Sequence, residues 1–316
     1  MTGVLRFAGR NGAWVVIAGV VMGLCFPFLS QLTRPYLAIA IFLFTFGSFL
    51  KIDAAAMRAQ VLRGNTALLM VAWANLGVPL AVFAIIRLTH PNPELAQGLL
   101  FWALVPTSPA CVAFAAILGL SAPLALFATV LATAASPFYL PALAAALGGY
   151  HLTVNPLAMS LQLLLIVGGA CLAAILVKRF AGAFIRENPD AVTGIAVFAL
   201  ILAGLGSMRG MQAYFLSQPE LALKLLVLSY ALNLGFQLCG TLLFWRGDRG
   251  SALTAGLIGG TRTITLAWVV LGNDVLPLAD VFFATGMVAK YTCPALTKWL
   301  IARVNNTASL AVAAGG

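Results

Sequence analysis

The sequence predicts an all-α integral membrane protein of ten transmembrane helices, built as two inverted five-helix repeats. The composition predicts the class, because 62% of the 316 residues are hydrophobic and 8% are charged, whereas soluble domains carry about 25% charged residues. An internal repeat predicts the two halves, and two interrupted helices at equivalent positions predict where the functional site lies. Ten spans of about 20 apolar residues each leave short loops and no soluble domain.

Apolar runs separated by short polar or Pro/Gly-rich stretches predict the individual helices. The first run has no small-residue cleavage site, so we interpret it as a transmembrane helix and not as a removed signal peptide. A basic stretch at 178–189 is predicted to be a loop. The predicted helices are 13–32, 35–51, 66–87, 96–119, 122–147, 157–177, 190–208, 222–245, 251–272 and 277–303.

The distribution of Lys and Arg predicts the orientation in the membrane. When the N-terminus is placed inside, most basic residues gather at the inside ends of the helices, as they do at cytoplasmic ends. Both termini are therefore predicted to be cytoplasmic, in a multi-pass protein of the cell inner membrane. The net charge of +10 is scattered over short loops, so it does not indicate a nucleic-acid partner. The basic residues at the outside ends are Arg34, Arg87, Arg209 and Lys224.

The two halves of the chain share short motifs in the same order. Asn75 in the third helix lies in an Ala-Asn-Leu-Gly motif, and Asn233 in the eighth lies in Leu-Asn-Leu-Gly. Five helices per repeat force the second repeat, 156–316, to insert upside down relative to the first, 1–155. Secondary transporters often have this architecture, with a site at the bilayer midplane. Two further matched tripeptides are Phe-Ala-Thr at 127–129 and 283–285, and Pro-Ala-Leu at 141–143 and 294–296.

Two helices are interrupted at equivalent places, the fourth by Pro-Thr-Ser-Pro at 106–109 and the ninth by Gly-Gly-Thr-Arg-Thr at 259–263. Ser and Thr can cap the second half of each helix, and Pro suits its first turn. Half-helix N-termini that face each other at mid-membrane form an anion site. The alternative is that Pro and Gly only kink packed helices. The predicted substrate-binding residues are Thr107, Ser108, Pro109, Gly260, Thr261, Arg262, Thr263 and Asn233.

Two basic residues lie at membrane depth, Arg262 beside the second interruption and Lys290 in the tenth helix. No Asp or Glu occurs at comparable depth, and an unpaired buried cation is unfavourable. Either an anionic substrate or backbone carbonyls must therefore meet these side chains. Asn75 and Asn233 must also satisfy their amides, and the interrupted backbone would serve. The predicted ion-coupling residues are Thr129, Lys290 and Asn75.

The sequence carries no enzyme signature. It has no H-E-x-x-H, no P-loop, no G-x-S-x-G and no intramembrane carboxylate pair. The five cysteines fall in apolar segments without paired spacing, so we expect neither a metal site nor disulfides. We therefore expect a protein that is not an enzyme and that needs no cofactor.

Three motifs carry a resemblance to a known family: 105–111 (Val-Pro-Thr-Ser-Pro-Ala-Cys), 136–141 (Ser-Pro-Phe-Tyr-Leu-Pro) and 251–254 (Ser-Ala-Leu-Thr). With its length and helix pattern, the sequence resembles the bile acid:sodium symporter family over most of the chain. The resemblance implies a panel of helices one, two, six and seven, and a core of helices three to five and eight to ten. Helices four and nine would cross in the core, organic anions would bind beside the crossing, and the core would move against the panel.

The sequence departs from the family at the implied sodium sites. A Ser-Asn pair of the family is Cys111-Val112 here, and a Glu and a Gln four residues apart are Gly256 and Gly260. Thr129 matches a sodium-site hydroxyl. Because sodium prefers hard oxygen ligands, these replacements predict transport without classical sodium coupling.

The sequence thus predicts a secondary transporter of a small organic anion, either bile-acid-like or another carboxylate, that works by alternating access. Coupling to Na+, to H+ through Lys290, or to nothing remains open. Its expected surroundings are the lipid bilayer, without an obligatory protein partner. One alternative is a cation/proton antiporter on a similar scaffold, which Lys290 would suit and the missing intramembrane Asp argues against. Another is a non-transporting receptor or assembly subunit, which the lack of a soluble domain disfavours.

Overall fold

The computed structural model describes residues 12–52, 65–148 and 155–314, and the secondary-structure elements in these ranges are helices. The all-α prediction is therefore confirmed. Within these ranges, six helical segments are long and apolar enough to cross a membrane, which makes this a multi-pass membrane protein. They are Pro27–Leu50, Asn65–Thr89, Ala122–Leu147, Pro156–Ala183, Val192–Ser217 and Pro219–Leu243.

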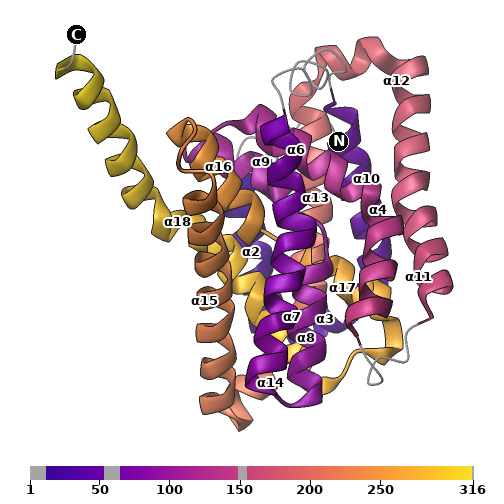
Figure 1. Cartoon of the computed structure of the whole chain (residues 1–316). Helices are drawn as coiled ribbons and strands as arrows, with labels where there is room; N and C mark the ends of the chain where they lie inside the picture. The colour runs from indigo at the N-terminus through magenta and orange to yellow at the C-terminus, as the bar shows by residue number, and fades with distance from the viewer. Residues whose placement is uncertain (1–11, 53–64, 149–154, 315–316) are drawn as a thin grey trace.

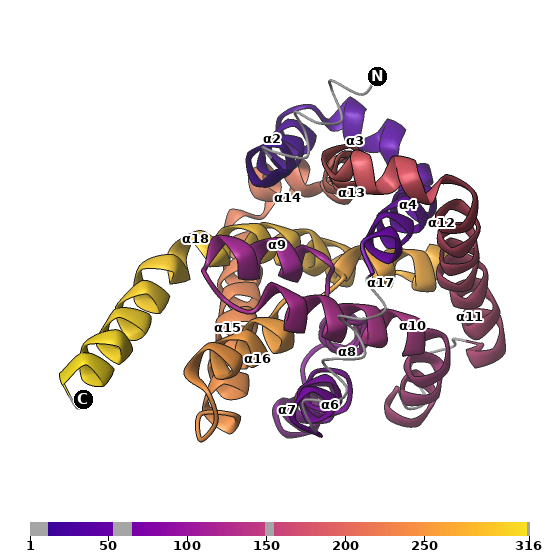
Figure 2. The same ribbon diagram turned by 90° about the horizontal axis from the view of Figure 1, so that it is seen from above.

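One set of helices packs as a curved row along one side of the molecule (Figure 2), and we call it the flanking group. Within it, α13 packs against α2, α3 and α4, and α12 packs against α4. Its members are α2 (Gly12–Cys25), α3 (Pro27–Thr33), the 3-10 turn η1 (Arg34–Tyr36), α4 (Leu37–Leu50), α12 (Gly169–Glu187) and α13 (Pro189–Ser207).

The remaining helices form a second packing group, which we call the crossing group. Here α15 packs against α16 and α18, α8 packs against α18, and α9 packs against α10. From the first half come α6 (Asn65–Ala72), the π-helical turn η2 (Trp73–Gly77), α7 (Val78–Thr89), α8 (Pro93–Leu104), α9 (Ala110–Ile117) and α10 (Ala122–Leu147). From the second half come α15 (Pro219–Leu243), α16 (Arg249–Gly260), α17 (Ile264–Leu271) and α18 (Pro277–Ala314).

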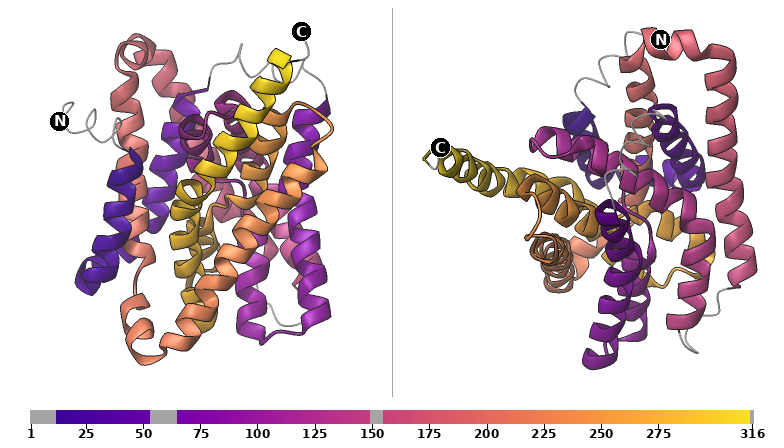
Figure 3. Two further views of the ribbon diagram at one scale, coloured as in Figure 1. Left: turned by 90° about the vertical axis from the view of Figure 1, so that its left-hand side faces the viewer. Right: turned by 45° about the horizontal axis from the view of Figure 1, so that its top comes forward.

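Short elements connect the two groups. α11 (Pro156–Leu163) packs against α10 and continues through a second π-helical turn, η4 (Leu164–Gly168), into α12. α14 (Met211–Ser217) leads from α13 to α15, and η5 (Gly272–Asp274) leads from α17 to α18. α2 begins and α18 ends at the same end of the molecule, opposite to α14 (Figure 1, Figure 3).

Glycines in α16 allow it to approach α15 closely. A Cβ on Gly256 would lie 2.2 Å from the carbonyl oxygen of Gln237 and 2.2 Å from Oγ1 of Thr241. A Cβ on Gly260 would lie 2.4 Å from the carbonyl oxygen of Asn233. These distances are too short for any side chain, so only glycine permits this packing.

The predicted loop at 178–189 is wrong in that α12 runs on to Glu187. The helix is nevertheless interrupted within this range, because the backbone leaves the helical conformation at Ala181 and produces a kink. The ammonium of Lys178 donates a hydrogen bond of 2.6 Å to the carbonyl oxygen of Ile52 after α4. A basic residue therefore remains within the helix, where it can bind the end of a neighbouring helix. The predicted first helix is also divided, since the chain leaves the helical conformation at Phe26 between α2 and α3.

Candidate functional site

The two interrupted segments meet directly in the crossing group. α8 ends at Leu104 and α9 begins at Ala110, while α16 ends at Gly260 and α17 begins at Ile264. Between these ends, Thr107 and Arg262 form an isolated antiparallel β-bridge. The interruptions predicted from Pro and Gly are thus both present, and the two segments pair through their backbones.

Two backbone hydrogen bonds flank this bridge. The amide of Ser108 donates to the carbonyl oxygen of Thr261 at 2.8 Å, and the amide of Thr263 donates to that of Pro106 at 2.9 Å. The amide of Ala110 donates to Oγ of Ser108 at 3.3 Å. The amides of Ser108, Ala110 and Thr263, which were expected to hold an anion, therefore have intramolecular acceptors, and in this conformation the bonds from Ser108 and Thr263 hold the crossing together.

Side chains satisfy the carbonyl groups at the end of α16. Oγ1 of Thr107 donates to the carbonyl oxygen of Ile258 at 3.1 Å. Nδ2 of Asn233 donates to that of Gly260 at 3.0 Å, and Oδ1 of Asn233 accepts from Nε2 of Gln237 at 2.6 Å. Because the last carbonyls of a helix have no partner within it, these bonds stabilise the end of α16 inside the protein.

Arg262 is completely buried and reaches two other segments of the crossing group. Its Nη2 donates to the carbonyl oxygen of Ala74 in η2 at 2.6 Å and to that of Ala103 in the last turn of α8. The negative end of a helix dipole favours a cation there. Its Nε and Nη1 are buried and have no hydrogen-bond partner in the described part of the chain. The guanidinium thus anchors the crossing and keeps two unused donors.

Asn75 does not bond the interrupted backbone in the way that Asn233 does. Its Nδ2 donates to the carbonyl oxygen of Val71 in its own helix at 2.8 Å, and its Oδ1 accepts from the hydroxyl of Tyr139 at 3.0 Å. The expectation that both asparagines satisfy the interruptions therefore holds for Asn233 and is wrong for Asn75. The equivalent sequence motifs do not create equivalent hydrogen bonds.

The ion-coupling candidates Lys290 and Thr129 are both buried in the crossing group. Lys290 is 2% exposed, and its ammonium lies 5.0 Å from the centroid of the Tyr291 ring. Thr129 is 1% exposed and donates to the carbonyl oxygen of Ser108 at 3.5 Å. The buried polar residues of the described ranges include no Asp or Glu, so no described carboxylate neutralises Lys290 at this depth.

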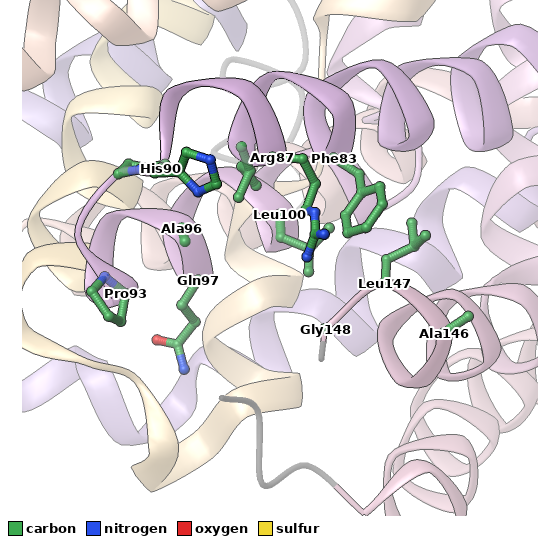
Figure 4. Close-up of a pocket in the computed structure, with 12 residues that line it drawn as sticks. Phe83, Arg87, His90, Pro93, Ala96, Gln97, Leu100, Ala146, Leu147 and Gly148 are labelled. Atoms are coloured by element: carbon green, nitrogen blue, oxygen red, sulfur yellow. The ribbon is translucent and has the colours of Figure 1, made fainter. Parts of the chain in front are cut away.

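A pocket lies away from the crossing, between the ends of α7, α8 and α10. Its volume is about 400 Å³. Figure 4 shows Arg87 and His90 with the apolar side chains of Phe83 and Leu147 around it. None of the predicted substrate-binding residues lines it. We therefore place the candidate site at the crossing, where buried donors without partners occur, and not at this pocket.

The sequence matches the model of the Sodium Bile acid symporter family over residues 38–219, which is more than half of the chain. No curated protein matches the sequence. The matched range contains Asn75, the first interruption and Thr129, and it ends before Arg262 and Lys290.

Proposed function

This chain belongs to the sodium bile acid symporter family, and from this premise we infer that it carries a small organic anion by alternating access. Family membership makes the protein a secondary transporter and not an enzyme. The observation that supports an anionic cargo is the buried guanidinium of Arg262, which has two donors without partners and no described carboxylate at its depth. A buried cation with unused donors attracts an anionic ligand.

We place the anion beside the crossing, where α9 begins. Pro109 is only half-buried there, unlike its neighbours Thr107 and Ser108, so this is the side from which a ligand reaches the interrupted segments. A shift of the two segments would release amide groups that are now bonded across the bridge. The proposed substrate-binding residues are Thr107, Ser108, Pro109, Gly260, Thr261, Arg262, Thr263 and Asn233.

We propose that this transport does not depend on Na+, although family membership implies sodium coupling. The chain has glycine at 256, where the family resemblance places a carboxylate ligand, and α15 leaves no room for a side chain at this position. Lys290 and Arg262 are two buried basic residues of the crossing group. Proton coupling, if the protein uses it, would involve Lys290, Thr129 and Asn75. The buried Lys290 also suits a cation/proton antiporter, the alternative cargo class.

The proposed architecture is ten spanning helices in two inverted repeats, 1–155 and 156–316. The flanking group, with α11, would be the panel, and the crossing group would be the core that moves against it. α2 begins and α18 ends at the same end of the molecule (Figure 1), which supports placing both termini on one side of the membrane. Lys and Arg counts favour the cytoplasmic side of the inner membrane.

The first test is a thermal-shift screen of the purified protein with organic anions, in Na+ buffer and in K+ buffer. A ligand that binds the native state raises its apparent stability. We expect a carboxylate or sulfonate to raise the melting temperature equally in both salts, and liposome uptake of that anion to be equally independent of Na+. Stabilisation only in Na+ would show that the sodium proposal is wrong.

The second test removes the charge of Arg262. We expect Arg262→Ala to abolish the anion-dependent shift, whereas Arg209→Gln, which changes an exposed arginine, leaves it unchanged. Melting without anion separates lost binding from lost folding, because Arg262→Ala also leaves two carbonyl oxygens without their donor. An unchanged anion shift in Arg262→Ala would make Arg262 a structural residue only.

A further inference from the structure

A cluster of three side chains joins the flanking group to the crossing group at the α14 end of the molecule. Nη2 of Arg34, in η1 of the flanking group, donates to Oδ1 of Asp280 in the first turn of α18 at 2.7 Å. Nε1 of Trp268, in α17, donates to the same carboxylate oxygen. The guanidinium of Arg34 also lies over the Trp268 ring, 4.9 Å from its centroid.

This cluster differs from an ordinary surface ion pair. The side chains of Arg34 and Asp280 are only 17% and 32% exposed, so solvent screens their attraction less than it screens an exposed pair. The indole donor and the cation–π contact fix the geometry of both charges. The exposed pair Lys224–Glu220 is the contrast, because it has side chains 70% and 83% exposed and lies within one helix.

The position of the cluster matters because the two groups otherwise pack mainly within themselves. α17 packs against α4, and close to this contact Nε2 of Gln162 in α11 donates to the carbonyl oxygen of Val269 at 2.8 Å. The hydrogen bonds from Arg34 and Gln162 both join elements that precede α14 to the segment formed by α17 and the start of α18. The two groups are therefore tied together at the α14 end.

We propose that Arg34 and Asp280 form a latch that keeps the α14 end closed and must open in the transport cycle. The proposal rests on alternating access, as proposed above. If the crossing group moves against the flanking group, the two must separate at this end in one of the two states. Since the latch is formed, the structure represents the state that is closed at the α14 end. The Lys and Arg counts assign this end to the side of the membrane opposite to the cytoplasm.

The test measures the separation of the two groups at the α14 end by spin labelling. Labels are placed at Tyr36 in η1 and Asn273 in η5, which are both exposed, in a background without the native cysteines. Pulsed electron–electron double resonance gives the distance distribution between the two labels. We expect one main distance in the parent protein and a several-fold larger population at longer distance in Arg34→Gln and in Asp280→Asn.

Two controls make the result specific. The charge exchange Arg34→Asp with Asp280→Arg should restore the short distance, and Lys224→Gln should leave the parent distribution unchanged. Unchanged distributions in both Arg34→Gln and Asp280→Asn, in proteins that still elute as folded, would overturn the latch. The spin labels measure the separation of the two groups without any cargo, so the latch is tested independently of the proposed function. If Arg34→Gln opens the α14 end but the protein transports no anion, the latch proposal stands and the proposed cargo is wrong.

Discussion

One interruption lies in each half of the chain, and the two are built from different residues. The first, between Leu104 and Ala110, contains Pro106 and Pro109. The second, between Gly260 and Ile264, follows glycines that pack against α15. Proline ends a helix by removing an amide donor, whereas glycine here permits a close approach of two backbones. The same interruption of a helix is thus reached by two different physical routes.

The two segments also satisfy each other's helix ends. Thr107 of the first segment donates to the carbonyl oxygen of Ile258 near the end of α16. Arg262 of the second donates to that of Ala103 near the end of α8. One donor is a neutral hydroxyl and the other is a cation. The backbone pairing is thus common to both segments, while the buried charge at the bridge comes from the second segment.

The largest expected effect comes from disrupting the glycine-dependent packing of α16 against α15. Gly256→Ala places a Cβ 2.2 Å from a backbone carbonyl oxygen of α15, and overpacking of this kind lowers stability by about 1–3 kcal/mol or more. We expect a large fall in melting temperature in detergent. Gly235→Ala is the matched control in α15, where the added Cβ meets nothing within 4 Å. Equal melting of the two variants would show that α16 does not need this close contact.

An intermediate effect separates the two equivalent asparagines. Asn233→Ala leaves the buried carbonyl oxygen of Gly260 without its donor and Gln237 without its acceptor, and each unsatisfied group costs about 1–3 kcal/mol. Asn75→Ala removes bonds to its own helix and to Tyr139, so we expect a smaller loss. Thermal melting of the two variants side by side measures the difference. The reverse order would mean that the first half, and not the second, depends on its asparagine.

The smallest expected effect lies at the start of α16, outside the membrane-spanning part. Oδ2 of Asp248 caps the helix by accepting from the amide of Ser251 at 2.8 Å, and this bond lowers the pKa of the carboxyl. Asp248→Ala should lower stability by about 0.5–2 kcal/mol.

The contribution of Asp248 depends on pH in a known direction. Because the folded protein lowers this pKa, the stabilisation by Asp248 is present at pH values above the ordinary pKa of a carboxyl group. It is lost as the pH falls through the lowered pKa. Asp248→Asn keeps a capping side chain, so we expect it to melt close to the parent at neutral pH and to lack this loss on acidification. A loss that persists in Asp248→Asn would assign the pH dependence to other groups.

The sequence was sufficient to locate the two interruptions, because proline and glycine act through their own backbone preferences. It was not sufficient to assign partners between distant segments. The acceptors of Arg262 are carbonyl oxygens of Ala74 and Ala103, and any residue type presents the same carbonyl. The pattern also did not link Arg34, which was interpreted only as a charge at an outside end, with Asp280, because the sequence does not show which distant charges become neighbours.

The shared motif also gave a wrong prediction where a carbonyl of the same helix competes for the asparagine side chain. Asn75 and Asn233 share a motif, yet Asn75 bonds a carbonyl one helical turn before it, which a side chain can always reach within its own helix. Asn233 bonds the end of α16 because that end lies beside it. The tertiary neighbour, and not the motif, decides which carbonyl is bonded.

The bridge between Thr107 and Arg262 has a consequence for biogenesis. The first interrupted segment is synthesised before its partner segment exists, so its backbone must wait in the membrane until the second segment arrives. Contacts of such long sequence separation form late and slowly. Pro106 and Pro109 have no amide hydrogen, so the waiting segment exposes fewer unsatisfied donors to lipid. The carbonyl of Ala103, which accepts from Arg262, is synthesised well before the arginine that binds it.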